Sequence, residues 1–273
     1  MMKAGRTLIV IASGLLLAAL GFPLYWMLIA SMTPESSLFA SQPLLPVTLS
    51  LDHYRALFDQ RDFWIPIRNS LIVATATALV ALPIATACAY ALARLPMRGR
   101  GFLLALILAV SMFPQISVVT PLYLILRELH LLNTYPGLVL PYVTFSTPLA
   151  VWLLTAFIRQ LPRDLEDAAM IDGASRLRAA RDVVLPLAAP GIASTAILTF
   201  LYCWNEFLFA LSFTLGPERY TVPVAVMLFR SRYQVPWGEV LAATVIASVP
   251  IVVLVLTCQQ RIVAGLSAGA SKG

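Results

Sequence analysis

Long apolar runs that almost never carry a charge recur along this chain, and they constrain its fold more than any other feature. The six runs cover residues 8–30, 71–93, 101–126, 137–158, 187–213 and 240–260. Each is long enough to cross the hydrocarbon core of a bilayer, which takes about 20 helical residues. With 60% of its residues hydrophobic, the chain has the composition of a membrane protein rather than a soluble domain. The sequence therefore predicts an all-α integral membrane protein, with six transmembrane helices in a single domain, residues 1–273.

Lysine and arginine are distributed unevenly over the segments between these runs. Twelve of the 19 lie in the two termini, the turn 94–101 and the segment 159–186, which six spans place on one side of the membrane. Segments rich in these residues are retained preferentially in the cytoplasm. We therefore expect cytoplasmic termini with a cytoplasmic tail, 262–273, and exterior segments at 32–68 and 216–239. The same bias accounts for the net charge of +6, so no nucleic-acid partner is expected.

The segment 159–186 is the most highly charged part of the chain, with five arginines and five acids. One charge in the middle of a bilayer costs about 2.5–3.5 kcal/mol, so the segment must be a loop between two spans. Its residues also favour local folding: Pro162 suits the first turn of a helix, and Asp172-Gly173 suits a break. Ser175 can cap a second short helix. Two interpretations fit, a solvated loop that only sets topology or a helical element that docks in a groove of another protein.

Within this loop, Asp167-Ala168-Ala169 is followed after three residues by Gly173, and after nine more by Val183, Leu185 and Pro186. The arrangement resembles the EAA loop of ABC import permeases, whose pattern is E-A-A, three residues, G, nine residues, I, any residue, L-P. Every spacing agrees, while Asp167 replaces glutamate and Val183 replaces isoleucine. The resemblance implies a coupling helix that docks on a cytoplasmic ATPase. The residues it implies for this coupling are Glu166, Asp167, Ala168, Ala169, Asp172, Gly173, Val183, Leu185 and Pro186.

Shorter motifs extend the resemblance over essentially the whole chain. They are Met112-Phe113-Pro114, the W-N-E-F-L run 204–208, the Q-R-I-V-A-G-L run 260–266 and the closing Ser271-Lys272-Gly273. These are similar to permeases of carbohydrate importers, most of all those for maltose and trehalose. The resemblance implies a heterodimer with a second permease subunit, two ATPase subunits or an ATPase dimer inside, and an extracytoplasmic substrate-binding protein. It further implies that the last outside loop reaches the binding protein, that the tail touches the ATPases, and that the complex lies in a bacterial cytoplasmic membrane.

The chain lacks the motifs of an enzyme. It has no G-x-x-x-x-G-K-[ST] phosphate loop, so ATP and Mg are expected on the partner ATPase and no cofactor on this chain. It has no H-E-x-x-H or G-x-S-x-G motif, and His53 and His130 lie in separate outside loops, so no metal site is expected. Cys88, Cys203 and Cys258 all lie in apolar runs and are interpreted as small core residues.

Polar residues inside two of the runs are candidates for a substrate pathway. They are Gln115, Tyr202, Trp204, Asn205 and Glu206. Sugars need aromatic surfaces for their apolar faces and polar partners for their hydroxyls, and this set offers both. An ionisable residue within a span is a functional candidate, yet Glu206 could equally pair with an outside arginine, Arg219 or Arg230. Similarly, Pro114 and Pro121 fit either a kinked, packed helix or a broken helix that lines a pathway.

The sequence thus predicts the permease subunit of an ATP-driven importer for a sugar or oligosaccharide. Three alternatives remain open. The chain could be an importer permease for a non-sugar solute, a channel that works without an ATPase, or a membrane enzyme. The last would need a catalytic pair, and Glu206 is the only acid within the predicted spans.

Overall fold

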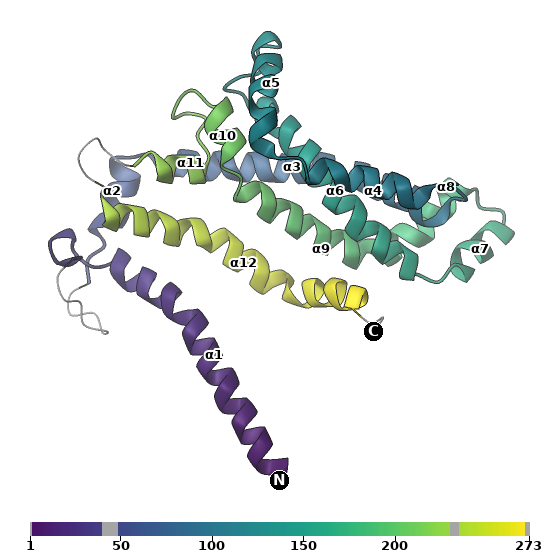
Figure 1. Ribbon diagram of the computed structural model, residues 1–273, viewed down its shortest axis with the longest axis horizontal. Helices are drawn as coiled ribbons and strands as arrows, with labels where there is room; N and C mark the ends of the chain where they lie inside the picture. Colours follow the sequence, from purple (N-terminus) through teal and green to yellow (C-terminus); the bar gives the residue numbers. More distant parts are fainter. Residues whose placement is uncertain (1, 40–48, 230–234, 271–273) are drawn as a thin grey trace. The chain divides into compact units, whose positions relative to one another are not determined.

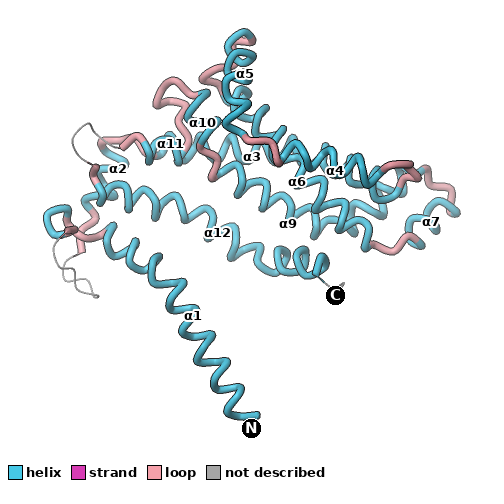
Figure 2. The backbone as a smooth tube through the Cα atoms, in the orientation of Figure 1, coloured by secondary structure: helices cyan, strands magenta, loops and turns pink. Residues whose placement is uncertain are grey.

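The computed structural model describes residues 2–39, 49–229 and 235–270, and within these ranges all regular structure is helical (Figure 2). The α-helices are α1 Met2–Ser31, α2 Asp52–Asp59, α3 Trp64–Arg94, α4 Arg100–Ser111, α5 Gln115–Glu128, α6 Tyr135–Gln160, α7 Asp164–Ile171, α8 Arg176–Ala179, α9 Leu185–Trp204, α10 Leu208–Phe213, α11 Val222–Met227 and α12 Trp237–Ala270 (Figure 1). A 3-10 turn, Glu35–Ser37, and a π-helical turn, Ala180–Val184, complete the described elements. The predicted all-helical fold class is confirmed.

Five helical segments are long and apolar enough to cross a membrane. They are Ile9–Ser31, Trp64–Arg94, Tyr135–Gln160, Arg176–Trp204 and Trp237–Thr257. A sixth candidate exists if α4 and α5, which meet at a bend, count as one span. The structure therefore agrees with five to six membrane-crossing elements, while the cytoplasmic location of the termini stays a prediction.

The third predicted span, 101–126, is a broken helix rather than one continuous helix. Helix α4 ends at Ser111, α5 begins at Gln115, and the two are bent by 81°. Pro114 lies at the N-terminal cap of α5, and its carbonyl accepts a hydrogen bond from Ser117 N at 3.0 Å. Proline has no N–H and its ring clashes with the preceding turn, so a helix can start here but cannot pass through undisturbed. The helix is therefore broken at Pro114, whereas Pro121 lies within the continuous helix α5.

The last two predicted spans also differ from the observed helices at their ends. Helix α9 stops at Trp204, where the sequence predicts a span to residue 213, and the short helix α10 follows it. Helix α12 continues to Ala270, so residues 262–270 of the predicted tail are helical, and 271–273 lie outside the described residues. Gly265, Ser267 and Gly269 of the tail therefore do not end the helix.

Two compact units make up the chain. The first contains Met1–Trp64 and Ala225–Pro250, and the second contains Ile65–Val224 and Ile251–Gly273. In the first unit, Arg61 Nε lies 2.6 Å from Glu239 Oε2, which fixes the segment after α2 to the start of α12. Tyr54 of α2 shares a 2.7 Å hydrogen bond with Ser31 at the end of α1. Polar contacts thus hold α2 between the two long helices of this unit.

The second unit is built around α6. This helix packs against α9 and α4, and its N-terminal half also packs against α10. At one end, the rings of Phe145, Phe209 and Phe213 form the core, with centroids 5.2 and 5.6 Å apart in succession. At the other end, buried alanines of α3, Ala85 and Ala89, pack with Leu154 and Ile158 of α6. Small side chains let membrane helices approach closely, which van der Waals packing requires there.

Candidate functional site

The charged loop folds into two short helices with a turn between them, as the sequence predicts. Asp164, Glu166 and Asp167 occupy the first turn of α7, where the helix dipole favours acids. Gly173 has a φ of 90°, the left-handed conformation that ends helices. Its N–H donates to Met170 O at 3.1 Å, and the N–H of Ala174 donates to Ala169 O at 3.0 Å. Glycine is therefore favoured at the point where the chain leaves α7.

The return from the loop to the membrane also follows from local chemistry. Ser175 caps α8, because its side-chain oxygen accepts a hydrogen bond from Arg178 N at 3.3 Å. Helix α8 passes through the π-helical turn into α9, and Pro186 follows closely after that turn, where a proline cannot donate the regular backbone hydrogen bond. Single π-helical turns in proteins often lie at functional sites. The loop is thus continuous with a membrane-crossing helix.

Apolar side chains on this loop face solvent. Ile171 is 87% exposed, Leu177 is 82% exposed and Leu165 is 47% exposed, and the small Ala168 is also exposed. We call these four residues the apolar loop face. Exposed apolar groups on a charged, polar segment are candidates for a contact with another protein or with a membrane surface. The apolar loop face gives such a contact both large anchors and a place for close approach.

Glu166 points the other way, into its own chain. Its Oε2 lies 3.3 Å from Arg94 Nε, and only 4% of the Arg94 side chain and 9% of the Glu166 side chain are exposed. The hydroxyl of Tyr90 donates to Glu166 Oε1 at 2.5 Å, and an Arg94 guanidinium N–H donates to Leu161 O at 2.9 Å. We call Tyr90, Arg94 and Glu166 the buried ion-pair cluster. The resemblance implies that Glu166 belongs to the ATPase contact. The structure instead buries its side chain against Arg94. From the sequence, Arg94 indicates only that the turn 94–101 is cytoplasmic.

The other residues expected in the coupling contact are divided between the surface and the interior. Asp167, Asp172, Leu185 and Pro186 are exposed, whereas Ala169 and Val183 are partly buried. Next to them, Val184 is buried in the core with α3 and α6. The exposed members lie on the same loop as the apolar loop face, and their role in coupling stays a prediction.

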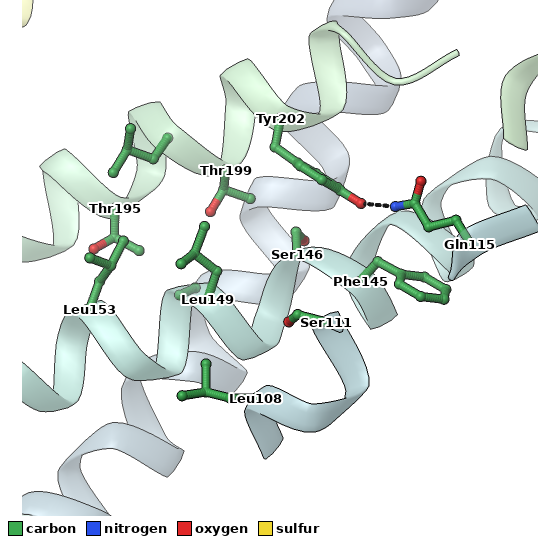
Figure 3. Close-up of a pocket in the computed structure, with 12 residues that line it drawn as sticks. Leu108, Ser111, Gln115, Phe145, Ser146, Leu149, Leu153, Thr195, Thr199 and Tyr202 are labelled. Atoms are coloured by element: carbon green, nitrogen blue, oxygen red, sulfur yellow. Dashed lines mark hydrogen bonds between the residues drawn. The ribbon is translucent and has the colours of Figure 1, made fainter. Parts of the chain in front are cut away.

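A cavity of about 200 Å³ lies in the second unit where α4, α5, α6 and α9 come together (Figure 3). Gln115 of α5 and Tyr202 of α9 meet at its edge, and Gln115 Nε2 donates to the Tyr202 hydroxyl at 2.5 Å. Leucines from α4, α6 and α9 contribute to its apolar wall. The structure thus brings together two predicted pathway residues that are 87 positions apart in sequence.

Four hydroxyl side chains lie among the apolar residues that line this cavity. Ser111, Ser146, Thr195 and Thr199 line it, and none of them was singled out from the sequence. Thr195 donates to Gly191 O at 2.8 Å, within its own helix. Ser146 Oγ is buried and has no hydrogen-bond partner among the described residues. A buried unpaired hydroxyl costs about 1–3 kcal/mol, so this group is poised to bind a polar group that enters the cavity.

Trp204, Asn205 and Glu206 do not line the cavity. Trp204 is buried and stacks on Phe200, with ring centroids 5.7 Å apart, and Asn205 Nδ2 donates to Leu201 O at 2.8 Å. The Glu206 carboxylate accepts hydrogen bonds from Phe209 N at 2.8 Å and Ala210 N at 3.1 Å. It therefore satisfies the first backbone donors of α10.

The ion pair that was one of the two alternatives for Glu206 is not found among the described residues. Arg219 instead lies over the ring of Tyr135, 4.5 Å from its centroid, and Arg230 lies outside the described residues. The two roles expected for Glu206 from the sequence were a place in the pathway and an ion pair. Its hydrogen bonds to the backbone of α10 were not expected. The signal is present in the sequence, since an acid two residues before the start of an apolar helix can accept hydrogen bonds from its free N–H groups.

The segment between α10 and α11 is anchored by two asparagines from distant parts of the chain. Asn69 is fully buried, and its amide donates to Glu218 O at 3.0 Å and to Tyr220 O at 2.9 Å. Asn133 donates to the Glu218 carboxylate at 2.6 Å and accepts from Leu215 N at 3.0 Å. The hydrogen bond from Asn133 lowers the pKa of the exposed Glu218 carboxyl from its ordinary value. This part of the predicted last outside loop is thus held in one conformation.

Comparison with known proteins agrees with this arrangement. The chain matches the family described as "Binding-protein-dependent transport system inner membrane component" over residues 81–267. It is 40% identical over 271 residues to the trehalose/maltose transport system permease protein MalG of Thermococcus litoralis, covering 98% of this chain and 97% of the relative. It is 43% identical over 253 residues to the trehalose transport system permease protein SugB of Mycobacterium tuberculosis, covering 92% of each chain.

A solved structure shares the fold. It is the crystal structure of a bacterial ABC transporter involved in the import of the acidic polysaccharide alginate, and the matched chain has a TM-score of 0.76 at 21% identity. The match covers 94% of this chain and 96% of that one. The family match spans more than half of the chain, and the two relatives match it almost from end to end. This chain therefore belongs to the binding-protein-dependent transport system inner membrane components, the multi-pass membrane permeases of ABC importers.

Proposed function

We propose that this chain carries a sugar or oligosaccharide across the membrane as the permease subunit of an ATP-driven importer. The observation that carries the proposal is the folded loop α7 to α9, which has the EAA pattern and turns an apolar face to solvent. The names of both relatives refer to trehalose or trehalose and maltose, which supports a sugar as the substrate. The hydroxyl-lined cavity between α4, α5, α6 and α9 supports the same class, since sugar hydroxyls need such partners.

The proposal includes an orientation in a cytoplasmic membrane, with both termini and the loop α7 to α9 inside. ATP and Mg would bind to two partner ATPase subunits, and the coupling loop would carry their closure to the spans. A second permease subunit would complete the pathway, and an extracytoplasmic binding protein would deliver substrate to the outer side. The end of α12 would touch the ATPases, as the resemblance implies. Rocking of the two permeases around a central site would then expose the substrate alternately to each side.

The experiment that tests this function uses the importer complex purified through a tag on this chain and reconstituted into liposomes with its binding protein. We expect trehalose or maltose to stimulate ATP hydrolysis and to accumulate inside in an ATP-dependent manner. Uptake that continues without ATP would favour the channel. Stimulation by a non-sugar solute alone would favour the alternative substrate class.

The orientation predicts a difference in labelling between two single cysteines. We expect Leu215→Cys to react with an impermeant thiol reagent in intact cells and Arg98→Cys to react only after permeabilisation, in a background without Cys88, Cys203 and Cys258. Both positions are exposed and neither has a positive φ, unlike Gly99 at 78°. The positive-inside distribution places Arg98 in the cytoplasm. Labelling of Arg98→Cys from outside would reverse the proposed orientation.

The cavity predicts a loss of apparent affinity when its polar groups are removed. Gln115→Leu and Ser146→Ala each delete one hydrogen-bonding group and keep the wall closed. We expect each to raise the KM for sugar uptake by about tenfold, the equivalent of one hydrogen bond of roughly 1.5 kcal/mol. Thr144→Val is the matched control, since its exposed hydroxyl donates to Leu140 O of its own helix, away from the cavity. An unchanged KM in both variants would remove this cavity from the pathway.

A further inference from the structure

The loop helix α7 is attached to the rest of its subunit by a charged residue. Glu166 is the one buried residue of α7, and its carboxylate is held by Arg94 and Tyr90. A surface helix is normally attached through an apolar face. Here Leu165 and Ile171 are exposed, while Met170 is half-buried. Helix α7 packs on α8 and the π-helical turn, and the buried ion-pair cluster is its polar link to α3.

Through Arg94, the buried ion-pair cluster connects the ends of two membrane helices, α3 and α6. Arg94 is the last residue of α3 and also donates to Leu161 O, directly after the end of α6. A second hydrogen bond joins the loop to α3, since the Arg163 guanidinium, at the start of α7, donates to Ala93 O at 3.3 Å. A displacement of α7 therefore acts directly on the ends of α3 and α6, as well as along the chain into α9.

Stability alone gives little reason for an ion pair at this position. Replacing a buried pair with well-packed apolar residues is often neutral or stabilising, whereas removing one partner leaves an uncompensated buried charge. An apolar anchor would hold α7 at least as firmly, but it could slide, because apolar contact has no preferred direction. The ion pair adds direction, because its two members are each held by a hydrogen bond at a defined angle, Glu166 by the Tyr90 hydroxyl and Arg94 by Leu161 O.

We propose that the Arg94–Glu166 pair, oriented by Tyr90, is the positioning link through which movement of the loop helix is transmitted to α3 and α6. The inference rests on the proposed function, because it assumes that an ATPase moves α7. Glu166 acts inside the subunit, and the apolar loop face makes the external contact. Recruitment of the ATPase and transmission of its movement are thus carried by different residues of the same loop.

The test uses the whole importer complex with four variants of this chain: Arg94→Met, Glu166→Met, the double variant and the control Asp164→Met. Asp164 is an exposed acid in the same helix, outside the cluster. Three quantities are measured, namely the amount of assembled complex, the ATPase that co-purifies and the sugar transported per ATP hydrolysed. We expect each single variant to lower the amount of complex and the double variant to restore it, since no charge is then left unpaired.

The decisive result is the sugar transported per ATP hydrolysed in the double variant. We expect a normal amount of bound ATPase but a ratio about fivefold or more below that of the wild type and of Asp164→Met, as for the loss of an allosteric coupling. A wild-type ratio in the double variant would make the pair purely structural and overturn the inference. Loss of the ATPase would also overturn it, because Glu166 would then belong to the docking contact.

If the double variant does not assemble, Tyr90→Phe provides a second test of the same link. It removes only the hydrogen bond to Glu166 Oε1, and we expect a smaller fall of the same ratio with normal assembly. An unchanged ratio would overturn the inference. If the proposed function is wrong, the result is different: no ATPase would co-purify even with the unmodified chain.

Discussion

Replacing Ile171 or Leu177 with aspartate is expected to abolish recruitment of the ATPase while the membrane helices still insert. The two side chains are the most exposed members of the apolar loop face, so neither substitution disturbs the core. Buried apolar anchors of a protein interface cost about 2–4 kcal/mol when lost, which corresponds to a roughly 30- to 1,000-fold weaker complex. A new carboxylate in the groove of the partner adds the cost of burying an unpaired charge.

The measurement is co-purification of the ATPase with this chain, together with sugar-stimulated ATP hydrolysis. Leu215→Asp is the matched control, because it makes the same change at an exposed leucine that is predicted to lie on the other side of the membrane. Recruitment at the wild-type level by both loop variants would show that this face is not the contact. The proposal of an ATPase-driven permease would then lose its main support within the chain.

Gly173→Val should weaken the same contact through the backbone rather than through a lost side chain. At a φ of 90° a β-branched residue is strained by about 1–2 kcal/mol, and relief of that strain would turn α7 away from α8. Because no other atom lies within 4 Å of a Cβ built at Gly173, any loss of recruitment would come from the backbone conformation and not from a clash within the subunit.

The sequence predicts the helical fold well because the dominant constraint is local. Each apolar run has to satisfy its backbone hydrogen bonds inside the bilayer, and a helix does this within one segment. The helix pair of the charged loop was also predictable, since Ser175 and Gly173 act on their immediate neighbours. The bend at Pro114 was predictable as a possibility, but its angle depends on the helices packed around it.

The site was less predictable because its key contacts join distant segments. Arg94 looked like a topology marker and Glu166 like a docking residue, and only their pairing across 72 positions shows that both are buried. Ser146 carries no motif, and its unpaired hydroxyl is visible only once α6 has been packed against its neighbours. Gln115 and Tyr202 were each selected for their chemistry alone, and the structure supplies the hydrogen bond between them.

Glu206→Ala is expected to lower the amount of assembled subunit more strongly than the removal of any exposed acid. Its carboxylate binds the backbone N–H groups of Phe209 and Ala210, both fully buried. Without an acceptor each of these donors costs about 1–3 kcal/mol, and the start of α10 loses its anchor in the core. Glu206→Gln should have an intermediate effect, because its amide oxygen can accept from one donor while its NH₂ group faces the other.

Two measurements separate this structural role from a role in the pathway: the amount of complex in the membrane and the transport per assembled complex. We expect Glu206→Ala and Glu206→Gln to lower the first and to leave the second near the wild-type value. Glu128→Ala is the control for the amount of complex, since its carboxylate is exposed at the end of α5. Normal assembly with impaired transport in Glu206→Gln would instead place the carboxylate in the pathway, and normal values of both quantities would leave Glu206 without either role.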